Sequence, residues 1–487
     1  MSVKDKFSFM RKVFMKTDKE KMLMRVNMTK KSLRQERLHD FLKNPTRVIV
    51  VSFALIISVG TLLLMLPFSS REGIFTSFPT AFFTATSATC VTGLIVEDTY
   101  TYFSTFGQVV ILLLIQFGGL GLVTITTFFN IAIRRKIGLK TAQLAQESIN
   151  SDGSQDIRVL IKMIILLTFG IELVGAIVLS GVFIPEFGAD GIFISVFLAI
   201  SAYCNAGFDI LGRIAPYTSL TTYSDNPVVL ITIMLLIIFG GLGFIVWYDL
   251  CLYRRHGRLI LHTKIVLLAT GILIIFGTVC FLALEWNNPF TIGKMPVWEK
   301  ILNGIFHSVS CRTAGFNTVD LVNMGSGTKL MSCFLMFIGA APGSTGGGIK
   351  VTTFIVLAVT VTSVMRGRDD TIIMGRKIVK QVVYKALAVT VIALIAVLIA
   401  TFVISYTVHE NGTMIGEIDA LFESTSAFAT VGLSVGVTGV ANLTSRMILA
   451  LTMFLGRVGP VALALTLLAR SNPDKHQIIP EGRIIVG

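Results

Sequence analysis

Length, composition and charge place most of this chain in lipid. Of its 487 residues, 53% are hydrophobic and only 14% are charged, and the mean hydropathy is +0.77. Soluble proteins carry about 25% charged residues, so this composition predicts an integral membrane protein. The net charge of +14 does not indicate nucleic-acid binding, because the Lys and Arg residues flank apolar runs in the pattern that orients membrane proteins. The six cysteines lack C-x-x-C or zinc-type spacing, which argues against a disulfide scaffold and a metal cluster.

The first 47 residues form a basic arm, with 14 Lys or Arg against 5 Asp or Glu. They contain no apolar stretch long enough to span a membrane or to serve as the core of a signal peptide, so we expect the arm to be cytoplasmic. Phe7, Met10 and Phe14 recur at helical spacing among lysines, which favours an amphipathic helix on anionic lipid. A solvated cytoplasmic arm is an equal alternative.

Apolar runs then follow in a repeating order. A spanning helix needs about 20 mostly apolar residues, and Val48–Pro67 is the first candidate. The next stretch, Ile74–Thr89, is too short and too polar to cross, and a second long run covers Phe106–Ile133. This unit of span, half-span and span recurs three times, with long runs at Val159–Ile184 and Val228–Tyr253, Ile265–Trp286 and Leu330–Val364, and Ala386–Val408 and Met447–Leu468.

A glycine-containing turn follows the half-span of every unit. The glycines are Gly93, Gly207, Gly315 and Gly432, separated by 114, 108 and 117 residues, and such regular spacing indicates internal repeats. We therefore predict an all-α integral membrane protein with eight transmembrane helices, in four tandem span/pore-helix/span repeats around one central pore. The predicted boundaries are a basic arm at 1–47, pore repeats at 48–133, 159–253, 263–364 and 386–470, and a cytoplasmic tail at 471–487.

The loops that join one unit to the next are basic, which predicts that they and both termini face the cytoplasm. These residues are Arg134, Arg135, Lys136 and Lys140, then Arg254, Arg255 and Arg258, and finally Arg366, Arg368, Arg376, Lys377 and Lys380. The loops within the units carry mostly acidic residues, which would concentrate cations at the outer face. They are Glu97, Asp98, Glu186, Asp190, Asp209, Asp225, Asp320, Glu410, Glu417 and Asp419.

The half-spans have the features of a cation filter. Non-helical backbone at membrane depth is tolerated only where it is buried in protein or lines a wet cavity. A dehydrated alkali cation needs several oxygens, and glycine lets consecutive carbonyls point one way. Each half-span also directs the negative end of its helix dipole toward the membrane centre. One glycine turn alone would indicate packing or capping, whereas four in register favour a pore.

The turns VTGL (Val91–Leu94), NAGF (Asn205–Phe208), RTAGFN (Arg312–Asn317) and TVGL (Thr430–Leu433) resemble those of the Trk/Ktr/HKT superfamily of potassium transporters. The resemblance runs from Pro45 onward and is strongest to KtrB-type bacterial membrane subunits, which also have eight spans without an extra N-terminal pair. It implies a potassium filter with one glycine from each turn, and glycine rather than serine at position 93 implies potassium rather than sodium. The expected filter residues are Cys90, Val91, Thr92, Gly93, Asn205, Ala206, Gly207, Thr313, Ala314, Gly315, Thr430, Val431 and Gly432.

The second span of the third repeat is too rich in helix breakers to stay regular, so we predict a loop inside the membrane. The resemblance implies that this loop is a gate, and that Arg457 in the last span contacts it. The expected gate residues are Gly339, Ala340, Ala341, Pro342, Gly343, Ser344, Thr345, Gly346, Gly347 and Gly348, together with Arg457. Nucleotide binding is not expected here, because Lys350 is followed by Val351 rather than Ser or Thr. Close helix packing explains the other glycine clusters, at Gly118–Gly121, Gly240–Gly243 and Gly456–Gly459.

Ionisable residues inside a membrane are costly and are usually paired or functional. Arg312 and Glu423 lie near the glycines of adjacent repeats, so we predict that they form an ion pair that braces the filter. Arg457 is expected to repel ions from a closed pore, with a purely structural pairing as the alternative. For Glu172 the expectation is a polar contact facing the helix bundle rather than an ion ligand.

The predicted function is regulated potassium uptake through a selective pore in the bacterial cell membrane. The alternative is a sodium- or proton-coupled secondary carrier, which parallel repeats and scarce acidic residues in the spans disfavour. No nucleophile–base set or metal-ligand cluster suggests an enzyme, and we expect no cofactor and no metal besides potassium. The resemblance implies a homodimer, a cytosolic ring of KtrA-type nucleotide-binding subunits and activation by sodium. It also suggests that the tail Pro480–Gly487 contacts the dimer partner, with a solvated tail as the alternative.

Overall fold

The computed structural model describes residues 45–121, 124, 127, 157–410 and 415–459. The chain divides into the units Met1–Val48 and Ile49–Gly487, and only residues 45–48 of the first unit are described. The basic arm before Pro45, the basic loop with Arg134, Arg135, Lys136 and Lys140, and the tail from 471 therefore lie outside the described residues.

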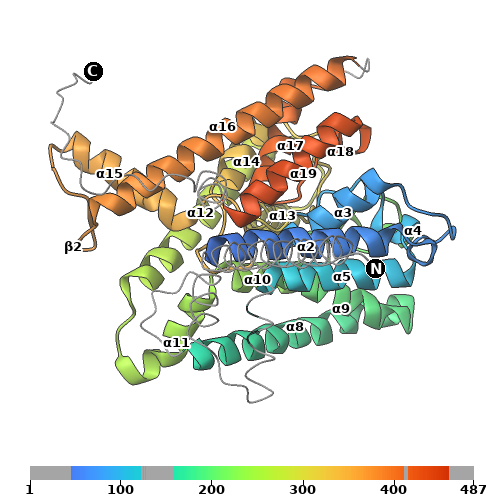
Figure 1. The fold of residues 1–487 in the computed structure, drawn as a ribbon, viewed down its shortest axis with the longest axis horizontal. Coiled ribbons are helices and arrows are strands. Elements are labelled where there is room, and N and C mark those ends of the chain that lie inside the picture. Colours follow the sequence, from blue (N-terminus) through green and yellow to red (C-terminus); the bar gives the residue numbers. More distant parts are fainter. Residues whose placement is uncertain (1–44, 122–123, 125–126, 128–156, 411–414, 460–487) are drawn as a thin grey trace, which may run out of the picture. The chain divides into compact units, whose positions relative to one another are not determined.

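The regular secondary structure of the described residues is almost all helical, as predicted (Figure 1). The first two repeats consist of α2 (Pro45–Met65), α3 (Phe78–Cys90), α4 (Thr99–Tyr102) and α5 (Thr105–Leu120), then α8 (Ile157–Phe187), α9 (Asp190–Tyr203), α10 (Pro227–Gly241) and α11 (Phe244–His256). The last two consist of α12 (Leu261–Glu285), α13 (Val297–Ser310), α14 (Ser326–Phe337) and α15 (Val351–Met365), then α16 (Lys380–Glu410), α17 (Glu417–Ala429), α18 (Val437–Val440) and α19 (Leu443–Val458). An antiparallel hairpin of β1 (Ile372–Ile373) and β2 (Arg376–Lys377) joins α15 to α16.

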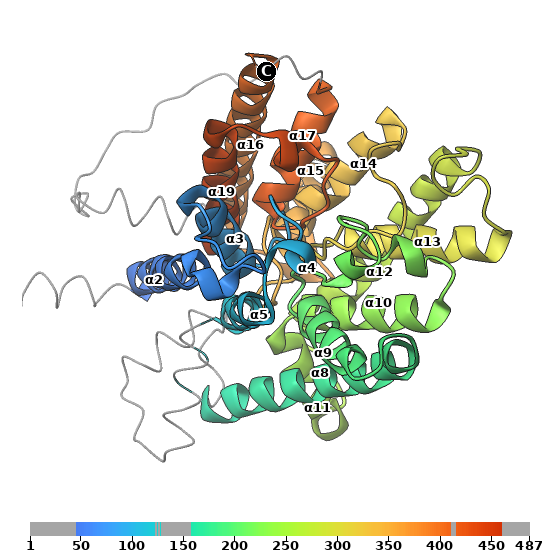
Figure 2. The same cartoon turned by 90° about the vertical axis from the view of Figure 1, so that its right-hand side faces the viewer.

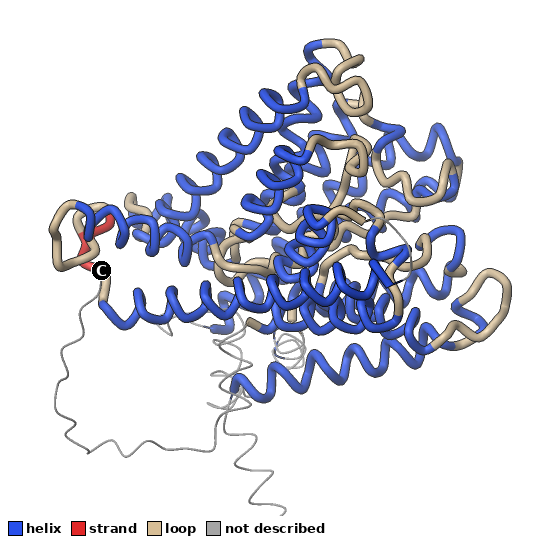
Figure 3. Tube along the Cα trace, turned by 90° about the horizontal axis from the view of Figure 1, so that it is seen from above, coloured by secondary structure: helices blue, strands red, loops and turns tan. Residues whose placement is uncertain are grey.

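Contacts between neighbouring repeats close into a ring. Repeat 1 packs on repeat 2 through α5 and α9, and repeat 2 on repeat 3 through α10 and α13. Repeat 3 packs on repeat 4 through α14 and α17, and repeat 4 returns to repeat 1 through α19 and α3. Figure 2 shows the four groups of helices arranged about a common centre, and Figure 3 shows loop segments gathered between the helices. The predicted four-repeat arrangement around one centre is confirmed.

The first helix of each repeat is a long apolar rod. Among the described residues, the helices long and apolar enough to cross a membrane are Arg47–Met65, Val159–Phe187, Leu261–Glu285 and Lys380–Thr407. Their large apolar side chains are exposed on one face, for example Leu62 at 66%, Leu166 at 72% and Phe402 at 73%. Lipid is the environment that suits such a face.

Among the described residues, the second helix is interrupted in the second repeat, which differs from the prediction, and in the third repeat, as predicted. We expected one continuous span over Val228–Tyr253, whereas α10 and α11 meet at a 93° bend. The reason is Gly243, whose positive φ of 92° no regular helix contains. The helices α5 and α19 end at equivalent glycines, Gly121 (φ 80°) and Gly459 (φ 96°). Whether those spans reach Ile133 and Leu468 lies outside the described residues.

Polar caps fix where the second helices begin. Asn226 accepts the backbone N–H groups of Val228 (3.1 Å) and Val229 (3.3 Å), with Pro227 as the first helical residue of α10. Ser104 and Asn442 cap α5 and α19 in the same way. These side chains satisfy amide groups that the first turn leaves unpaired, so the helices begin at defined residues.

Glycines in the second helices permit contact with the ends of the pore helices. A Cβ added at Gly118, Gly240 or Gly456 would collide with a backbone carbonyl oxygen. The oxygens concerned belong to Thr89, Tyr203 and Phe428, at the C-terminal ends of α3, α9 and α17. The prediction that close packing explains these glycine clusters is confirmed at these positions, and the approach is to backbone rather than to side chains.

We predict that Gly456→Ala destabilises the protein, because the added methyl group would overlap the Phe428 carbonyl. Overpacking of this kind costs about 1–3 kcal/mol. Gly271→Ala is the matched control, because Gly271 lies within α12 and a Cβ there meets nothing within 4 Å. Thermal unfolding of the purified protein in detergent measures both. An equal melting temperature for the two variants would contradict the packing argument.

Candidate ion-conducting site

The four predicted filter segments share one backbone conformation. In each, a residue with left-handed φ lies two positions before the glycine. These residues are Val91 (φ 59°), Asn205 (φ 60°), Thr313 (φ 69°) and Thr430 (φ 51°). The glycines also have positive φ, with values of 93° for Gly93, 70° for Gly207, 86° for Gly315 and 95° for Gly432. Left-handed backbone is uncommon in residues other than glycine, so its recurrence in all four segments indicates that the fold imposes this conformation. We call these segments, 90–93, 205–207, 313–315 and 430–432, the filter loops.

The filter loops contact one another in a closed cycle. A Cβ added at each glycine would meet the carbonyl oxygen just before the glycine of another loop: Gly93 against Ala206, Gly207 against Ala314, Gly315 against Val431, and Gly432 against Thr92. The first of these separations is 2.5 Å and the second is 2.6 Å. The carbonyls of Thr92, Ala206, Ala314 and Val431 therefore belong to a single ring of backbone. A ring of carbonyl oxygens is the chemistry that replaces the hydration shell of a cation.

Serines near the ends of the pore helices hold the filter loops, and the sequence analysis missed them. The hydroxyl of Ser87 accepts the Gly93 N–H (3.1 Å), and the hydroxyl of Ser426 accepts the Gly432 N–H (3.0 Å). In the other two repeats, Ser201 and Ser310 donate to carbonyls just after the glycine. Each serine lies five or six residues before its glycine, so an alignment of the four repeats with one another could have found them.

The predicted break in the third repeat is present, because α14 ends at Phe337 and α15 begins at Val351. We call Gly339–Gly348 the gating loop. Its two ends are bridged, since the Gly339 N–H donates to the Ile349 carbonyl (2.8 Å). Its tip lies against the filter loops. A Cβ at Gly346 would collide with the Thr313 hydroxyl, and a Cβ at Gly347 would collide with the Thr430 hydroxyl. The gating loop is therefore in direct contact with the third and fourth filter loops.

The gating loop is also attached to the bend between α10 and α11. The amide groups of Ala341 and Thr345 donate to the carbonyls of Gly241 (3.1 Å) and Gly240 (3.3 Å). In return, the Phe244 N–H donates to the Gly343 carbonyl (2.8 Å). The break in the second repeat therefore provides backbone groups that pair with the gating loop of the third.

Two cationic side chains bind carbonyls of the gating loop. Arg457 donates to the Thr345 carbonyl, and also to the Gly118 (2.5 Å) and Gly119 (3.2 Å) carbonyls at the end of α5. The structure thus places Arg457 in contact with the gating loop, where the sequence analysis expected it. Lys350, to which we assigned no role, donates to the Gly346 carbonyl (2.6 Å).

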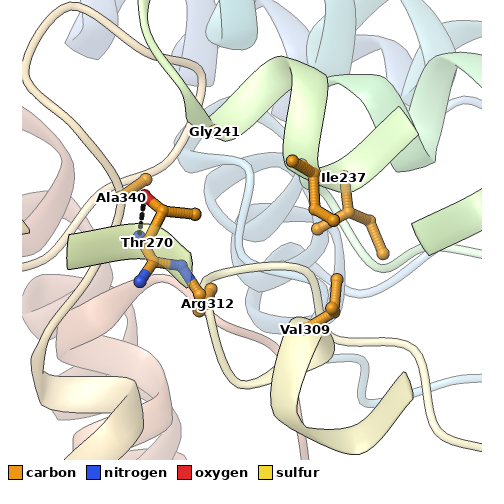
Figure 4. A pocket seen from close by; sticks show the side chains of 7 residues that line it. Ile237, Gly241, Thr270, Val309, Arg312 and Ala340 are labelled. Carbon is orange, nitrogen blue, oxygen red and sulfur yellow. Dashed lines mark hydrogen bonds between the residues drawn. The ribbon is translucent and has the colours of Figure 1, made fainter. Parts of the chain in front are cut away.

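The predicted ion pair between Arg312 and Glu423 is wrong. Figure 4 shows the Arg312 guanidinium hydrogen-bonded to the Thr270 hydroxyl (3.5 Å), beside a cavity that Ile237 and Ala340 also line. Within the described residues no carboxylate forms an ion pair with Arg312, and its Nη1 has no hydrogen-bond partner.

Glu423 instead binds groups of its own repeat. Its carboxylate accepts the Ser434 hydroxyl (2.8 Å), the Val435 N–H (3.2 Å) and the Thr438 N–H (3.1 Å). These donors lie just after the fourth filter loop. Glu423 is fully buried, and its carboxylate has hydrogen-bond donors without needing a cation. The contacts tie the segment after Gly432 to the pore helix α17, which agrees with a supporting position but not with the predicted partner.

One carboxyl lies close to a filter loop on the side where α10 begins. Asp209 follows Gly207 by two residues and accepts the Leu211 N–H (3.0 Å). Burial raises the pKa of the Asp209 carboxyl to about 7, and the neighbouring Asp98 carboxylate adds to this rise against the opposing Leu211 hydrogen bond. Asp98 links two repeats, because it caps α4 and also accepts the Tyr217 N–H (3.0 Å).

Comparison with known proteins agrees with this geometry. The TrkH family model, described as a cation transport protein, matches residues 15–475. The Ktr system potassium uptake protein B of Bacillus subtilis (strain 168) is 38% identical over 91% of this chain and 97% of its own length. The potassium/sodium uptake protein NtpJ of Enterococcus hirae is 37% identical, with the same coverage.

A solved structure has the same fold. The potassium transporter TrkH from Vibrio parahaemolyticus matches with a TM-score of 0.67 at 17% identity, over 87% of this chain and 85% of that one. The family model and these relatives together cover nearly the whole chain, which therefore belongs to the TrkH family of cation transport proteins, membrane transporters that are not enzymes.

Proposed function

We propose that this protein takes up potassium through the ring of four filter loops. The observation that carries the proposal is the closed cycle of contacts in which each filter glycine meets the carbonyl of another loop. Four loops of similar conformation bring backbone oxygens together in one ring, and a dehydrated alkali cation needs several such oxygens. The names of the two bacterial relatives support potassium as the substrate, and the name of NtpJ supports a role for sodium, as substrate or activator.

The gating loop would obstruct the path on one side of the filter. Its glycines touch two filter loops, and Arg457 and Lys350 hold its carbonyls. A cation leaving the filter would therefore meet both a backbone barrier and the positive charge of Arg457. We infer that conduction requires the loop to leave this position, which breaks its hydrogen bonds to α10 and α11.

The basic loops support an orientation with the gating-loop side and both termini in the cytoplasm and with Asp209 at the outer mouth. The hairpin of β1 and β2 is flanked by Arg366, Arg368 and Lys380. It follows α15, and α15 begins just after the gating loop, so this helix connects the hairpin to the loop. A cytosolic nucleotide-binding subunit of the KtrA type that docks on this basic region could act on the gate through α15. The naming of the relatives as parts of a Ktr system supports such a subunit, and a homodimer of this chain would complete the assembly.

We predict that Gly93→Ser impairs potassium selectivity. The serine Cβ would come within 2.5 Å of the Ala206 carbonyl oxygen and distort the ring at a φ of +93°. Gly73→Ser is the matched control, because Gly73 also has positive φ (+68°) but a Cβ there meets nothing within 4 Å. The measurement is growth rescue of a potassium-uptake-deficient bacterium at limiting potassium, with and without a KtrA-type partner. Equal rescue by both variants, without sodium leak, would remove the first glycine from the filter.

We predict that deleting Pro342–Gly348 raises potassium flux. The deletion can close, because residues 338 and 349 pair at the base of the loop. Arg457→Ala should also increase flux in the absence of the partner, since it releases Thr345. Thr452→Val on the same helix is the control, because Thr452 bonds only its own helix at the Ile448 carbonyl (2.7 Å). Unchanged or lower flux in a folded deletion variant would count against the gate.

We predict that the apparent KM for potassium falls as the external pH rises from about 6 to 8. The pKa of Asp209 is raised to about 7, so this carboxyl is neutral below pH 7 and ionised above pH 7. The ionised carboxylate attracts cations to the outer mouth. Asp209→Asn should remove the pH dependence and hold KM at the high value. The exposed Asp225, in the same segment, provides the control Asp225→Asn. A pH profile that survives in Asp209→Asn would assign the titration to another group.

A further inference from the structure

A buried carboxyl lies behind the second filter loop, outside the ion path described above. Glu172, in the middle of α8, is only 4% exposed. The Gln116 side-chain amide of α5 donates to both of its oxygens, at 3.2 Å and 3.4 Å. No described residue forms an ion pair with Glu172. The expectation of a polar contact facing the helix bundle fits this position, but the contact also has a specific neighbour.

That neighbour is Cys204, which directly precedes the second filter loop. Its Sγ lies 3.7 Å from Gln116 Oε1 and 3.9 Å from Glu172 Oε1, within reach of a thiol hydrogen bond to either. A Cβ added at Gly119 would approach Cys204 Sγ to 2.8 Å, so α5 is packed directly on this thiol. Glu172, Gln116 and Cys204 thus form one cluster drawn from α8, α5 and the end of α9.

A second contact ties the same segment to α8. The Thr168 hydroxyl donates to the Tyr203 hydroxyl at 3.2 Å. Thr168 and Glu172 are four residues apart and therefore lie on one face of the helix. Two consecutive residues at the end of α9, Tyr203 and Cys204, are held by this face immediately before the left-handed Asn205.

The third repeat has a different arrangement at its cysteine, which lies four residues before the filter glycine instead of three. Cys311 lies 3.5 Å from His307 Nε2, which in turn lies 2.9 Å from the Ser332 hydroxyl. Both partners come from the third repeat itself, from α13 and α14. In the second repeat, by contrast, the cysteine is held across a boundary between repeats, because Gln116 belongs to the first.

We propose that Glu172 is a positioning residue for the second filter loop, acting through Gln116 and Cys204, and that it thereby sets the preference for potassium over sodium. The proposal rests on the function proposed above. The carbonyl of Ala206 lies against Gly93 and Gly207 lies against Ala314, so a shift of Cys204 changes the spacing of carbonyls on two sides of the ring. A carbonyl ring selects between alkali cations by the geometry and number of its oxygens.

The test measures potassium uptake by cells that lack other uptake systems, with the full-length chain and its partner, at rising sodium. Glu172→Leu and Gln116→Leu should each raise the KM for potassium and strengthen inhibition by sodium by roughly fivefold, as loss of one hydrogen bond predicts, with Vmax little changed. Glu172→Gln should behave as wild type, because its amide can exchange hydrogen bonds with Gln116. Ser180→Ala is the control on α8, since Ser180 bonds only the Ile177 carbonyl (2.7 Å) of its own helix.

Wild-type selectivity in Glu172→Leu and Gln116→Leu would overturn the proposal, and so would a Glu172→Gln variant that fails as Glu172→Leu does, because charge rather than position would then matter. If Glu172→Leu does not reach the membrane, Gln116→Leu carries the test alone. Gly207→Ser in the same cells separates the two proposals. If Gly207→Ser leaves selectivity intact, the filter itself is misassigned, whereas an effect of Gly207→Ser without one of Glu172→Leu or Gln116→Leu rejects only the positioning role.

Discussion

The absence of a side chain at four backbone positions is the constraint on which the rest of the structure depends. Each filter glycine touches the carbonyl of another repeat, so a side chain at any one of them would push two repeats apart. This contact also fixes the position of each pore helix along the chain. The left-handed residue that follows the helix lies only two positions before the filter glycine. The ring of packed repeats, from α5 on α9 around to α19 on α3, is the helical counterpart of the same closed cycle.

A second set of glycines extends this constraint to the second helices of three repeats, α5, α10 and α19. Gly118, Gly240 and Gly456 lie against carbonyls at the ends of their own pore helices, so α5, α10 and α19 pass directly behind filter loops. At Gly243 the helix turns away by 93°, and in the third repeat the chain forms the gating loop. The helix breaks and the close contacts with the pore helices have the same requirement, because each needs residues without a Cβ.

Backbone features of the site could be predicted from sequence more fully than side-chain partners, of which the contact of Arg457 with the gating loop was expected from the resemblance. Regular spacing of the glycines located the four filter loops, and the density of glycine and proline between residues 339 and 348 located the gating loop, because a regular helix does not tolerate these residues. The bend at Gly243 was missed because hydropathy alone continues through it. The Arg312–Glu423 pair failed because distance from a glycine along the chain does not specify side-chain direction, and Glu423 finds its donors at Ser434, Val435 and Thr438 in its own repeat.

In the proposed function, the position of two basic side chains explains how one short loop could oppose a cation that the filter favours. Thr345 and Gly346 present carbonyls below the filter, which would otherwise coordinate an ion as the filter carbonyls do. Arg457 and Lys350 already occupy these oxygens. In the proposed function, a passing ion therefore meets the positive charge of Arg457 instead of free oxygen ligands. Because Arg457 also binds carbonyls at the end of α5, any movement that withdraws it from Thr345 changes the first repeat as well as the third.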